Sequence, residues 1–197
     1  MKNSRTIDIL CKRLIDSEII RWRYNLRNTQ WKEFYFTDVF EDIQRGKRLK
    51  KGDHQEGDMP YISSTSLNNG VLCFVQPQKK LIQKGNCIAF IRNGEGSMGY
   101  AVYKSEDFIA TSDMTLGYNP NLNRYTGTFI TTIADRIRGK YNFGYKRNAA
   151  RLAKEILTLP VTNEGEINWK YMEAYLREKE TDRILCYLKQ MCDRMVQ

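Results

Sequence analysis

This chain of 197 residues has few histidines and no closely spaced pair of cysteines, and each shortage excludes certain kinds of metal site or disulfide. The one histidine, His54, stands in a polar stretch and is expected to be a solvated loop side chain, because one histidine cannot build a His-ligated metal cluster. The five cysteines, at positions 11, 73, 87, 186 and 192, are odd in number and include no Cys-x-x-Cys pair. This spacing predicts reduced thiols rather than a disulfide framework or a zinc site.

The chain also has no long apolar run of the kind that forms a signal peptide or a membrane span. Its N-terminal stretch shows apolar periodicity, but charged residues interrupt it at Asp8, Lys12, Arg13, Asp16 and Glu18. Charges at this density are incompatible with insertion into hydrocarbon. We therefore expect a cytoplasmic protein with no membrane partner.

Catalytic sets are missing as well. No P-loop, paired metal carboxylates or Ser/His/Asp set can be assembled, and general-base catalysis would have to depend on carboxylates, none of which stands out. Residues 94–99 match G-x-G-x-x-G, but a dinucleotide site needs a helix next, and residues 100–103 are strand-like. We therefore expect a non-catalytic protein without a cofactor. The alternative is a small nucleotide- or S-adenosylmethionine-binding enzyme that uses this loop.

What the chain has in excess is positive charge. Lys and Arg number 32 against 23 acidic residues, which gives a net charge of +9 and favours a polyanionic partner such as nucleic acid. An apolar content of 41% with 12% aromatic residues supports a packed core rather than disorder. The bland alternative is a soluble basic protein with no nucleic-acid ligand.

Cations cluster in two stretches. In residues 45–51, five of the seven side chains are cationic, and a row of hydroxyls and amides follows at 63–69 before the turn glycine Gly70. The second stretch, 136–154, interleaves cations, aromatics and amides. Cations hold phosphates without reading sequence, whereas amides, hydroxyls and some cations reach base edges. The predicted phosphate contacts are Arg45, Lys47, Arg48, Lys50 and Lys51. The candidates for groove readout are Ser64, Thr65, Asn68, Asn69, Asn93, Asn142, Lys146, Arg147 and Asn148.

The periodicities predict a mixed α/β (α+β) fold with a mostly β core. Short apolar runs between residues 60 and 118 are separated by Gly, Asn, Pro and Asp, which is typical of strands and turns. Helices are expected at 6–22, 125–137 and 149–156. We predict an N-terminal helix and linker over 1–30, a globular domain over 31–165 and a C-terminal helix over 166–197.

The C-terminal stretch from residue 169 contains no Gly or Pro and places apolar residues at steps of three and four. This pattern predicts a long amphipathic helix, although the apolar pattern lapses around residues 179–182. Its bland interpretation is packing on its own domain. The alternative is a helix that docks a partner through Ile184, Leu188, Met191 and Met195.

Taken together, several of these segments resemble the specificity (S) subunits of type I restriction–modification systems, and in particular their target recognition domains. The basic segment 45–49 resembles the family's lead-in, and residues 60–65 with 68–71 resemble its most recognisable block. Residues 93–99 resemble its glycine-serine-glycine loop, and 108–113 its following strand and aspartate. Residues 159–161 and 169–173 resemble its exit into a long helix, so the resemblance spans about residues 31–176.

The resemblance implies a non-catalytic reader of double-stranded DNA that works with a modification (methyltransferase) subunit and, in the full system, with a restriction or translocase subunit. Full-length members have two recognition domains, whereas this chain has room for one. It therefore resembles a half subunit, a truncated product or a separated domain. A half subunit would pair with a second copy through its helices and read two inverted half-sites. The third candidate function, besides the specificity subunit and the small enzyme described above, is a nucleic-acid binder that is indifferent to sequence.

Overall fold

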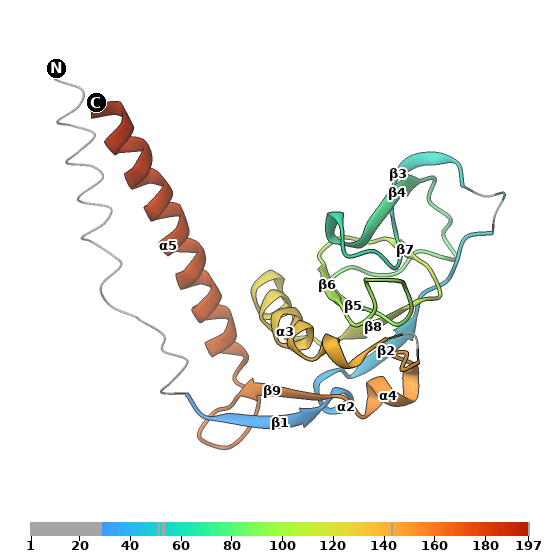
Figure 1. The fold of residues 1–197 in the computed structure, drawn as a ribbon, viewed down its shortest axis with the longest axis horizontal. Coiled ribbons are helices and arrows are strands. Elements are labelled where there is room, and N and C mark those ends of the chain that lie inside the picture. The colour runs from blue at the N-terminus through green and yellow to red at the C-terminus, as the bar shows by residue number, and fades with distance from the viewer. Residues whose placement is uncertain (1–28, 51, 53, 143, 197) are drawn as a thin grey trace. The chain divides into compact units, whose positions relative to one another are not determined.

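The computed structural model describes residues 29–50, 52, 54–142 and 144–196; within the last helix, the side chains of residues 192, 193, 195 and 196 are not described. The helix predicted over residues 6–22 lies outside the described residues, as does Lys51. The chain divides into two compact units, one formed by Gln30–Asn168 and the other containing the C-terminal helix from Trp169 (Figure 1). Each unit is described by itself.

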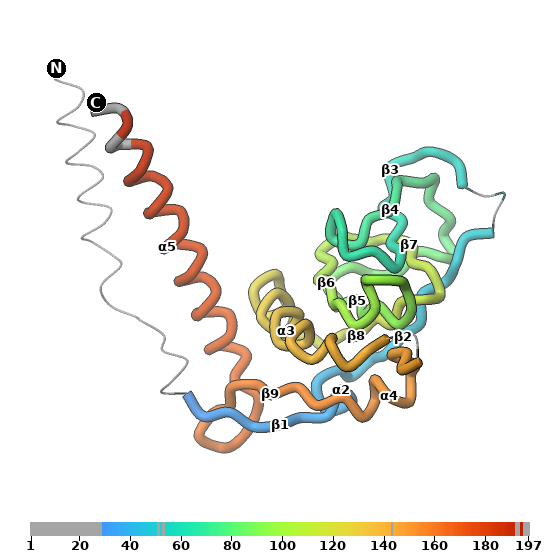
Figure 2. The backbone as a smooth tube through the Cα atoms, viewed as in Figure 1, coloured from blue at the N-terminus to red at the C-terminus, as the bar shows by residue number. Residues whose placement is uncertain are grey.

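The described strands of the larger unit form three sheets. A two-stranded antiparallel sheet pairs β1 (Trp31–Tyr35) with β9 (Ile156–Pro160). A four-stranded antiparallel sheet has the order β2 (Asp42–Arg45), β8 (Met114–Tyr118), β5 (Cys87–Ile91) and β6 (Ala101–Lys104). A three-stranded sheet has the order β4 (Val71–Val75), β3 (Glu56–Ile62) and β7 (Ile109–Ala110), in which β3 and β7 run parallel. Figure 2 shows the chain leaving β2 in one sheet and arriving at β3 in the other.

Strand β5 is the centre of the core. All five of its residues are buried, which explains why its sequence is a continuous apolar run rather than an alternating one. Cys87, Ala89 and Ile91 pack with the apolar side chains of β3, β7 and β8, while Phe90 packs against Phe36 and Phe40. The two edge-to-face ring pairs of Phe90, at centroid distances of 4.9 and 5.4 Å, each add about 0.5–1.5 kcal/mol beyond area burial.

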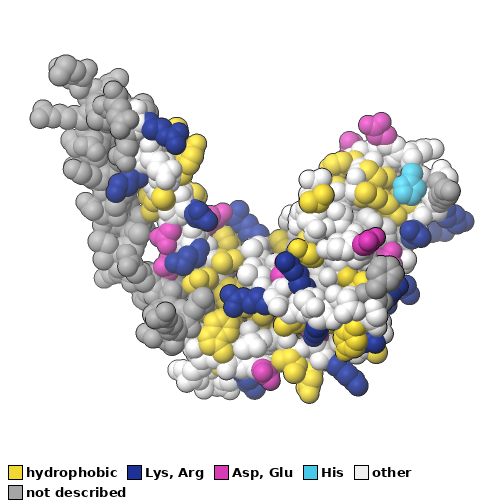
Figure 3. All heavy atoms as spheres, viewed as in Figure 1, with side chains coloured by type: hydrophobic (Ala, Val, Ile, Leu, Met, Phe, Trp, Pro, Cys, Tyr) yellow, Lys and Arg dark blue, Asp and Glu magenta, His cyan; other side chains and the backbone are white. Residues whose placement is uncertain are grey.

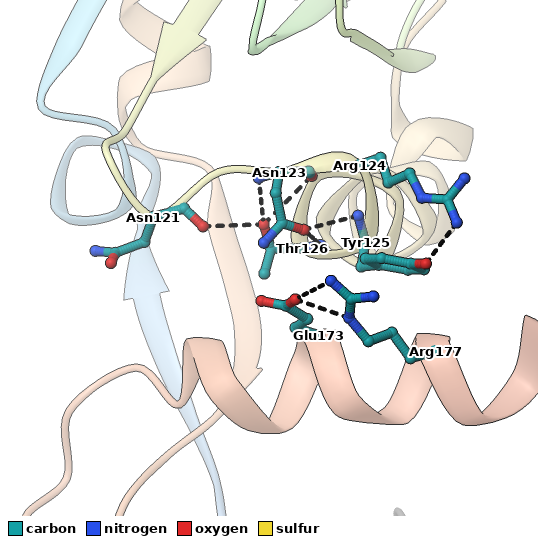
Figure 4. Close-up of polar contacts among 7 residues, drawn as sticks. All are labelled: Asn121, Asn123, Arg124, Tyr125, Thr126, Glu173 and Arg177. Atoms are coloured by element: carbon teal, nitrogen blue, oxygen red, sulfur yellow. Dashed lines mark hydrogen bonds and ion pairs between the residues drawn. The ribbon is translucent and has the colours of Figure 1, made fainter.

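Three α-helices complete this unit: α2 (Phe36–Val39), α3 (Arg124–Arg136) and α4 (Ala149–Ala153). Helix α3 agrees with the helix predicted over 125–137. Its N-terminus is capped by Asn123, whose side-chain oxygen accepts from the amides of Tyr125 and Thr126 at 2.9 and 3.1 Å (Figure 4). Thr126 completes a capping box by accepting from the Asn123 amide and donating to Asn121.

Helix α4 is shorter than the 149–156 prediction. Its cap, Asn148, accepts from the amide of Arg151 at 2.9 Å, and the helix ends at Ala153. Ile156 instead begins β9 and pairs with Tyr35. The strand partner, which lies more than 100 residues away, overrides local helix propensity here.

The second unit is represented by α5 (Trp169–Val196), a single 28-residue helix of about 42 Å at 1.5 Å per residue. Its first half carries the stacked pair Tyr171–Tyr175. It also carries the Glu173–Arg177 ion pair at 2.7 Å (Figure 4). The helix stays continuous where the apolar pattern lapses, and there Lys179 pairs with Asp182 at 3.4 Å. The predicted mixed α/β class with a long C-terminal helix is confirmed. In the described part of the chain, no helix combines the length and apolar character needed to cross a membrane.

Candidate nucleic-acid interface

Four chain segments meet where several strands of the larger unit begin or end. After β2, Gly46 donates its amide to Met114 at 3.1 Å; after β3 and β7, Thr111 donates to Ile62 at 2.9 Å. After β5, Arg92 donates to Asp113 at 2.8 Å. These backbone hydrogen bonds bring together residues that are up to 68 positions apart in the sequence. The four segments are residues 45–50, 63–69, 92–97 and 111–113, and we call their exposed and partly exposed side chains the strand-end surface; Gly46, Leu49, Ser97 and Thr111 within these ranges are buried.

The basic segment is anchored to this surface at its start. The Nε atom of Arg45 donates to the carbonyl oxygen of Ser112 at 3.0 Å. Gly46 passes so close to the neighbouring turn that an added Cβ would lie 2.0 Å from the Thr111 oxygen. The glycine is therefore needed for this close approach. Beyond it Lys47, Arg48 and Lys50 are exposed, and Figure 3 shows cations gathering with the histidine on the segment between β2 and β3.

Arg92 is part of this surface and was absent from the sequence prediction. It is half-buried, and burial first, then the charge of Arg45, lowers its pKa, while the carboxylate of Asp113 acts in the opposite direction. Its Nε atom is buried without a hydrogen-bond partner. The signal in the sequence was weak: an arginine directly after a fully apolar strand, next to the candidate reader Asn93.

The glycine-rich loop packs against the hydroxyl-rich loop rather than forming a cofactor site. The Oγ atom of Ser97 donates to the Ser64 carbonyl at 2.7 Å, and an added Cβ on Gly94 would lie 2.8 Å from the Ser64 Cβ. After Gly99 the chain enters strand β6, not a helix. A helix N-terminus, which a dinucleotide fold uses for its pyrophosphate, does not follow the loop. The prediction that residues 100–103 are strand-like therefore agrees with the structure.

A cleft of about 440 Å³ continues from the glycine-rich loop. It is lined from one segment by Gly94, Glu95, Gly96, Met98 and Tyr100, and from another by Arg138, Gly139, Tyr141 and Asn142. Between them, the guanidinium carbon of Arg138 lies 4.1 Å from the centre of the Tyr100 ring. Arg138 is exposed and lines this cleft, and Lys140, which is also exposed, follows two residues later.

Three of the predicted amide readers already have local partners. The side-chain oxygen of Asn142 accepts from the amides of Gly144 and Tyr145, at 2.9 and 3.0 Å, and that of Asn148 caps α4. The side-chain nitrogen of Asn69 donates to the Tyr103 carbonyl at 3.2 Å. The amides of Asn142 and Asn148 shape a turn and a helix end, which is a common use of asparagine in loops, whereas that of Asn69 ties its segment to β6. All three are exposed, so their remaining polar atoms stay accessible.

Of the other predicted readers, Ser64, Thr65, Asn68 and Asn93 lie in the segments of the strand-end surface, whereas Lys146 lies in the second basic stretch. Ser64, Thr65 and Asn93 are partly exposed, whereas Asn68 and Lys146 are exposed. Thr65 uses its hydroxyl oxygen to accept from the Leu67 amide at 3.1 Å, which fixes the turn before Asn68.

Arg147 was wrongly predicted to reach a DNA groove. Its side chain is fully buried in an ion pair with Glu155, and it also donates to the Gly99 carbonyl at 2.9 Å. The guanidinium is enclosed by rings, with its central carbon 4.9 Å from the centre of Phe90. Sequence reasoning missed this because the compensating carboxylate lies eight residues away, across α4. A buried arginine with these partners has no donor left on the protein surface.

On α5, the predicted partner residues Ile184, Leu188 and Met191 are 54%, 43% and 43% exposed. The side chain of Met195 is outside the described part of the helix. Tyr187, 62% exposed, extends this apolar row and was not predicted. Among the described residues, no group of three or more His, Cys, Asp or Glu side chains is arranged to hold a metal ion.

The domain is of mixed α/β class and gathers cations, hydroxyls and amides at its strand ends. A long helix follows it in the sequence. This architecture is that of a DNA-reading module. The model of the type I restriction modification DNA specificity domain matches residues 28–186, and the chain belongs to that family. DNA specificity, rather than catalysis, is the function of such a domain.

Individual relatives agree. The chain is 29% identical over 157 residues to the specificity subunit S.BcgI of a type II restriction enzyme from Heyndrickxia coagulans, covering 79% of this chain and 45% of the relative. In fold it is similar to the S subunit of a type I restriction–modification system from M. genitalium, with a TM-score of 0.57 at 16% identity over 98% of this chain and 53% of that one. The HsdS subunit from Thermoanaerobacter tengcongensis gives 0.52 at 14% identity over 96% and 46%. The chain thus spans about half the length of these relatives.

Proposed function

We propose that this chain reads a specific sequence of double-stranded DNA and directs a modification (methyltransferase) subunit, and in a complete system a restriction or translocase subunit, to that sequence. The observation that carries the proposal is the convergence of the strand-end surface in a member of a DNA specificity family. Together, the four segments place cations, the first of which is anchored, beside accessible hydroxyls and amides. These are the two kinds of contact that a specific DNA interface combines. We also propose that the protein acts in the cytoplasm.

The proposed contacts divide by chemistry. Arg45, Lys47, Arg48, Lys50 and Lys51 hold phosphates, together with Arg138 and Lys140 at the cleft. Ser64, Thr65, Asn68, Asn93 and Lys146 read base edges, and Asn69, Asn142 and Asn148 contribute through the atoms that their turns leave accessible. Arg92 joins the readers, because a guanidinium next to Asn93 has the fork that suits guanine.

The proposed organisation follows from the sequence: residues 31–165 recognise DNA and residues 166–197 dock a partner. The proposed partner face is the row Ile184, Leu188, Met191 and Met195, of which the first three are exposed. A second copy of the chain that pairs through these helices, with residues 1–30 joining in, would present two recognition domains for two inverted half-sites.

Selection from a pool of randomised duplexes tests the central claim. The full chain, alone and with its modification subunit, is expected to enrich one sequence motif at a fixed salt concentration. Binding without enrichment would identify a sequence-indifferent binder. Thermal stabilisation by NAD(P), ATP or S-adenosylmethionine, with none by DNA, would favour the small-enzyme alternative.

A further inference from the structure

We infer that Arg147 is a positioning residue for DNA reading: buried beneath the recognition surface, it fixes the spacing between the glycine-rich loop and the 138–142 segment. The inference rests on the proposed function, because it assigns a role within the same interface. Arg147 itself contacts no ligand. Its contribution to specificity passes through the two segments that it joins.

The geometry of Arg147 uses each nitrogen of its guanidinium. Nε donates to Oε2 of Glu155 at 3.1 Å, and Nη2 pairs with Oε1 of the same carboxylate. Nη1 donates to the carbonyl of Gly99 at 2.9 Å and more weakly to that of Tyr100 at 3.4 Å. A fork of this kind sets direction as well as distance, which a point-charge ammonium cannot do.

Tyr141 links the same pair to the other wall of the cleft. Its hydroxyl donates to Oε2 of Glu155, and its ring lies 5.3 Å from the guanidinium carbon of Arg147. Burial, followed by the hydrogen bond to Glu155, raises the pKa of Tyr141, so the phenol stays protonated as the donor. The ring itself lines the cleft, as do Tyr100 and Asn142.

The two walls also touch directly. Gly99 has a φ of +91°, and an added Cβ there would lie 2.9 Å from the Cβ of Arg138 and 3.0 Å from the Tyr141 ring. Arg138, whose guanidinium covers Tyr100, therefore has its backbone pressed against the end of the glycine-rich loop. Because this contact is tight, a shift of either wall is transmitted to the other.

Glu155 ties the assembly to the scaffold. Its carbonyl accepts from the Phe36 amide at 2.8 Å, directly after β1. Neither Arg147 nor Glu155 has exposed side-chain area. A buried ion pair contributes little net stability compared with apolar packing, and such pairs are retained in some proteins because they specify one arrangement. Here the arrangement that it specifies is the separation of two loops that carry the proposed DNA contacts.

The test compares four variants of the full chain: Arg147→Lys, Arg147→Met, Tyr141→Phe and the matched control Arg48→Met. Far-ultraviolet circular dichroism first establishes folding. Affinities are then measured for the motif enriched by the wild-type chain and for a scrambled duplex, each across a salt series.

If Arg147 is a positioning residue, the ratio of the affinity for the motif to the affinity for the scrambled duplex falls about tenfold or more in the folded Arg147 variants. One well-aligned base contact supplies a discrimination of this size. Their binding to the scrambled duplex and its salt slope stay at the wild-type values. Arg48→Met, by contrast, lowers the salt slope by about 1 and weakens both duplexes equally. Tyr141→Phe leaves the ion pair in place and is expected to show the same selective loss, but a smaller one. If Arg147→Met does not fold, this variant tests the inference.

Two results would overturn the inference. An unchanged affinity ratio in folded Arg147→Lys and Tyr141→Phe would show that the network is packing alone. A salt slope lowered in Arg147→Met as much as in Arg48→Met would show a direct phosphate contact. If the wild-type chain enriches no motif, the proposed function itself is wrong, which this design distinguishes from failure of the positioning role.

Discussion

The Nε atom of Arg45 donates a 3.0 Å hydrogen bond to the main-chain oxygen of Ser112, 67 residues further along the chain. This contact joins the start of the basic segment to the turn that precedes β8. The first cation of the segment is therefore held in place, and the exposed side chains of Lys47 and Arg48 follow from a fixed point. A pre-positioned cation loses less conformational entropy on meeting a phosphate than one on a free tail.

Neutralising an outer cation of this segment tests its role. We expect Arg48→Ala to weaken binding to specific and random duplexes by the same factor and to lower the salt slope by about 1, because one phosphate contact is lost. Fluorescence anisotropy at several salt concentrations measures both. Lys189→Ala, an exposed change on α5, is the control. Loss of affinity for the specific duplex alone would instead make Arg48 a base reader.

Two substitutions of Asn148 distinguish its role in capping α4 from a role in contacting DNA, because only one of them adds a negative charge. Because its side-chain oxygen caps α4, Asn148→Ala should destabilise the domain by about 1 kcal/mol, whereas Asn148→Asp should keep the cap and the stability. Chemical denaturation measures this difference. If Asn148 also faces DNA, Asn148→Asp should weaken binding without unfolding, since a carboxylate repels phosphate. Equal stability of all three proteins would show that the cap contributes nothing.

The general fold could be predicted because its signals are local. The apolar run at 87–91, the turn residues around it and the uninterrupted helix pattern after residue 169 are all readable from neighbours in sequence. The pairing of β1 with β9 could not be read in this way, because its partners are more than 100 residues apart. Ile156, assigned to a helix by local pattern, shows the consequence.

The candidate site was predictable in composition but not in orientation. A row of cations and amides marks the right segments, yet whether one side chain faces solvent or core depends on partners such as Glu155 for Arg147. Arg92 was missed because, unlike Arg147, it does not belong to a cluster of cations in the sequence. It stands alone beside an apolar strand, and only its contact with the 111–113 turn brings it next to Arg45.

Removing one member of the buried ion pair should be costly. Arg147→Met leaves the Glu155 carboxylate buried and unpaired, so we expect a loss of about 3–5 kcal/mol in the free energy of unfolding. The double variant Arg147→Met/Glu155→Leu should recover much of that loss, because neither charge then remains. Urea denaturation of both proteins gives the comparison. A single variant as stable as the wild type would mean that Arg147 is not buried against Glu155.

The thiols of the chain offer an independent test of the core. Burial raises the pKa of Cys87 to about 12, and the thiolate is the reactive form, so Cys87 should resist iodoacetamide at pH 8. Cys186 is exposed and should be labelled before Cys87. Peptide mass spectrometry reads out each site, and labelling in denaturant is the control. Rapid modification of Cys87 in the folded protein would contradict the central position of β5.

The apolar row on α5 leads to the last prediction. Leu188 and Met191 are each 43% exposed. A variant in which both are replaced by glutamate should keep α5 helical, because glutamate is a good helix former. We expect Leu188→Glu/Met191→Glu to abolish association with the modification subunit or with a second copy, while the domain keeps its affinity for DNA. Light scattering of the chain alone and with its partner measures the mass. Lys189→Glu, which changes charge between the two positions without touching the apolar row, is the matched control. An unchanged mass for the double variant under both conditions would show that α5 docks no partner through this row.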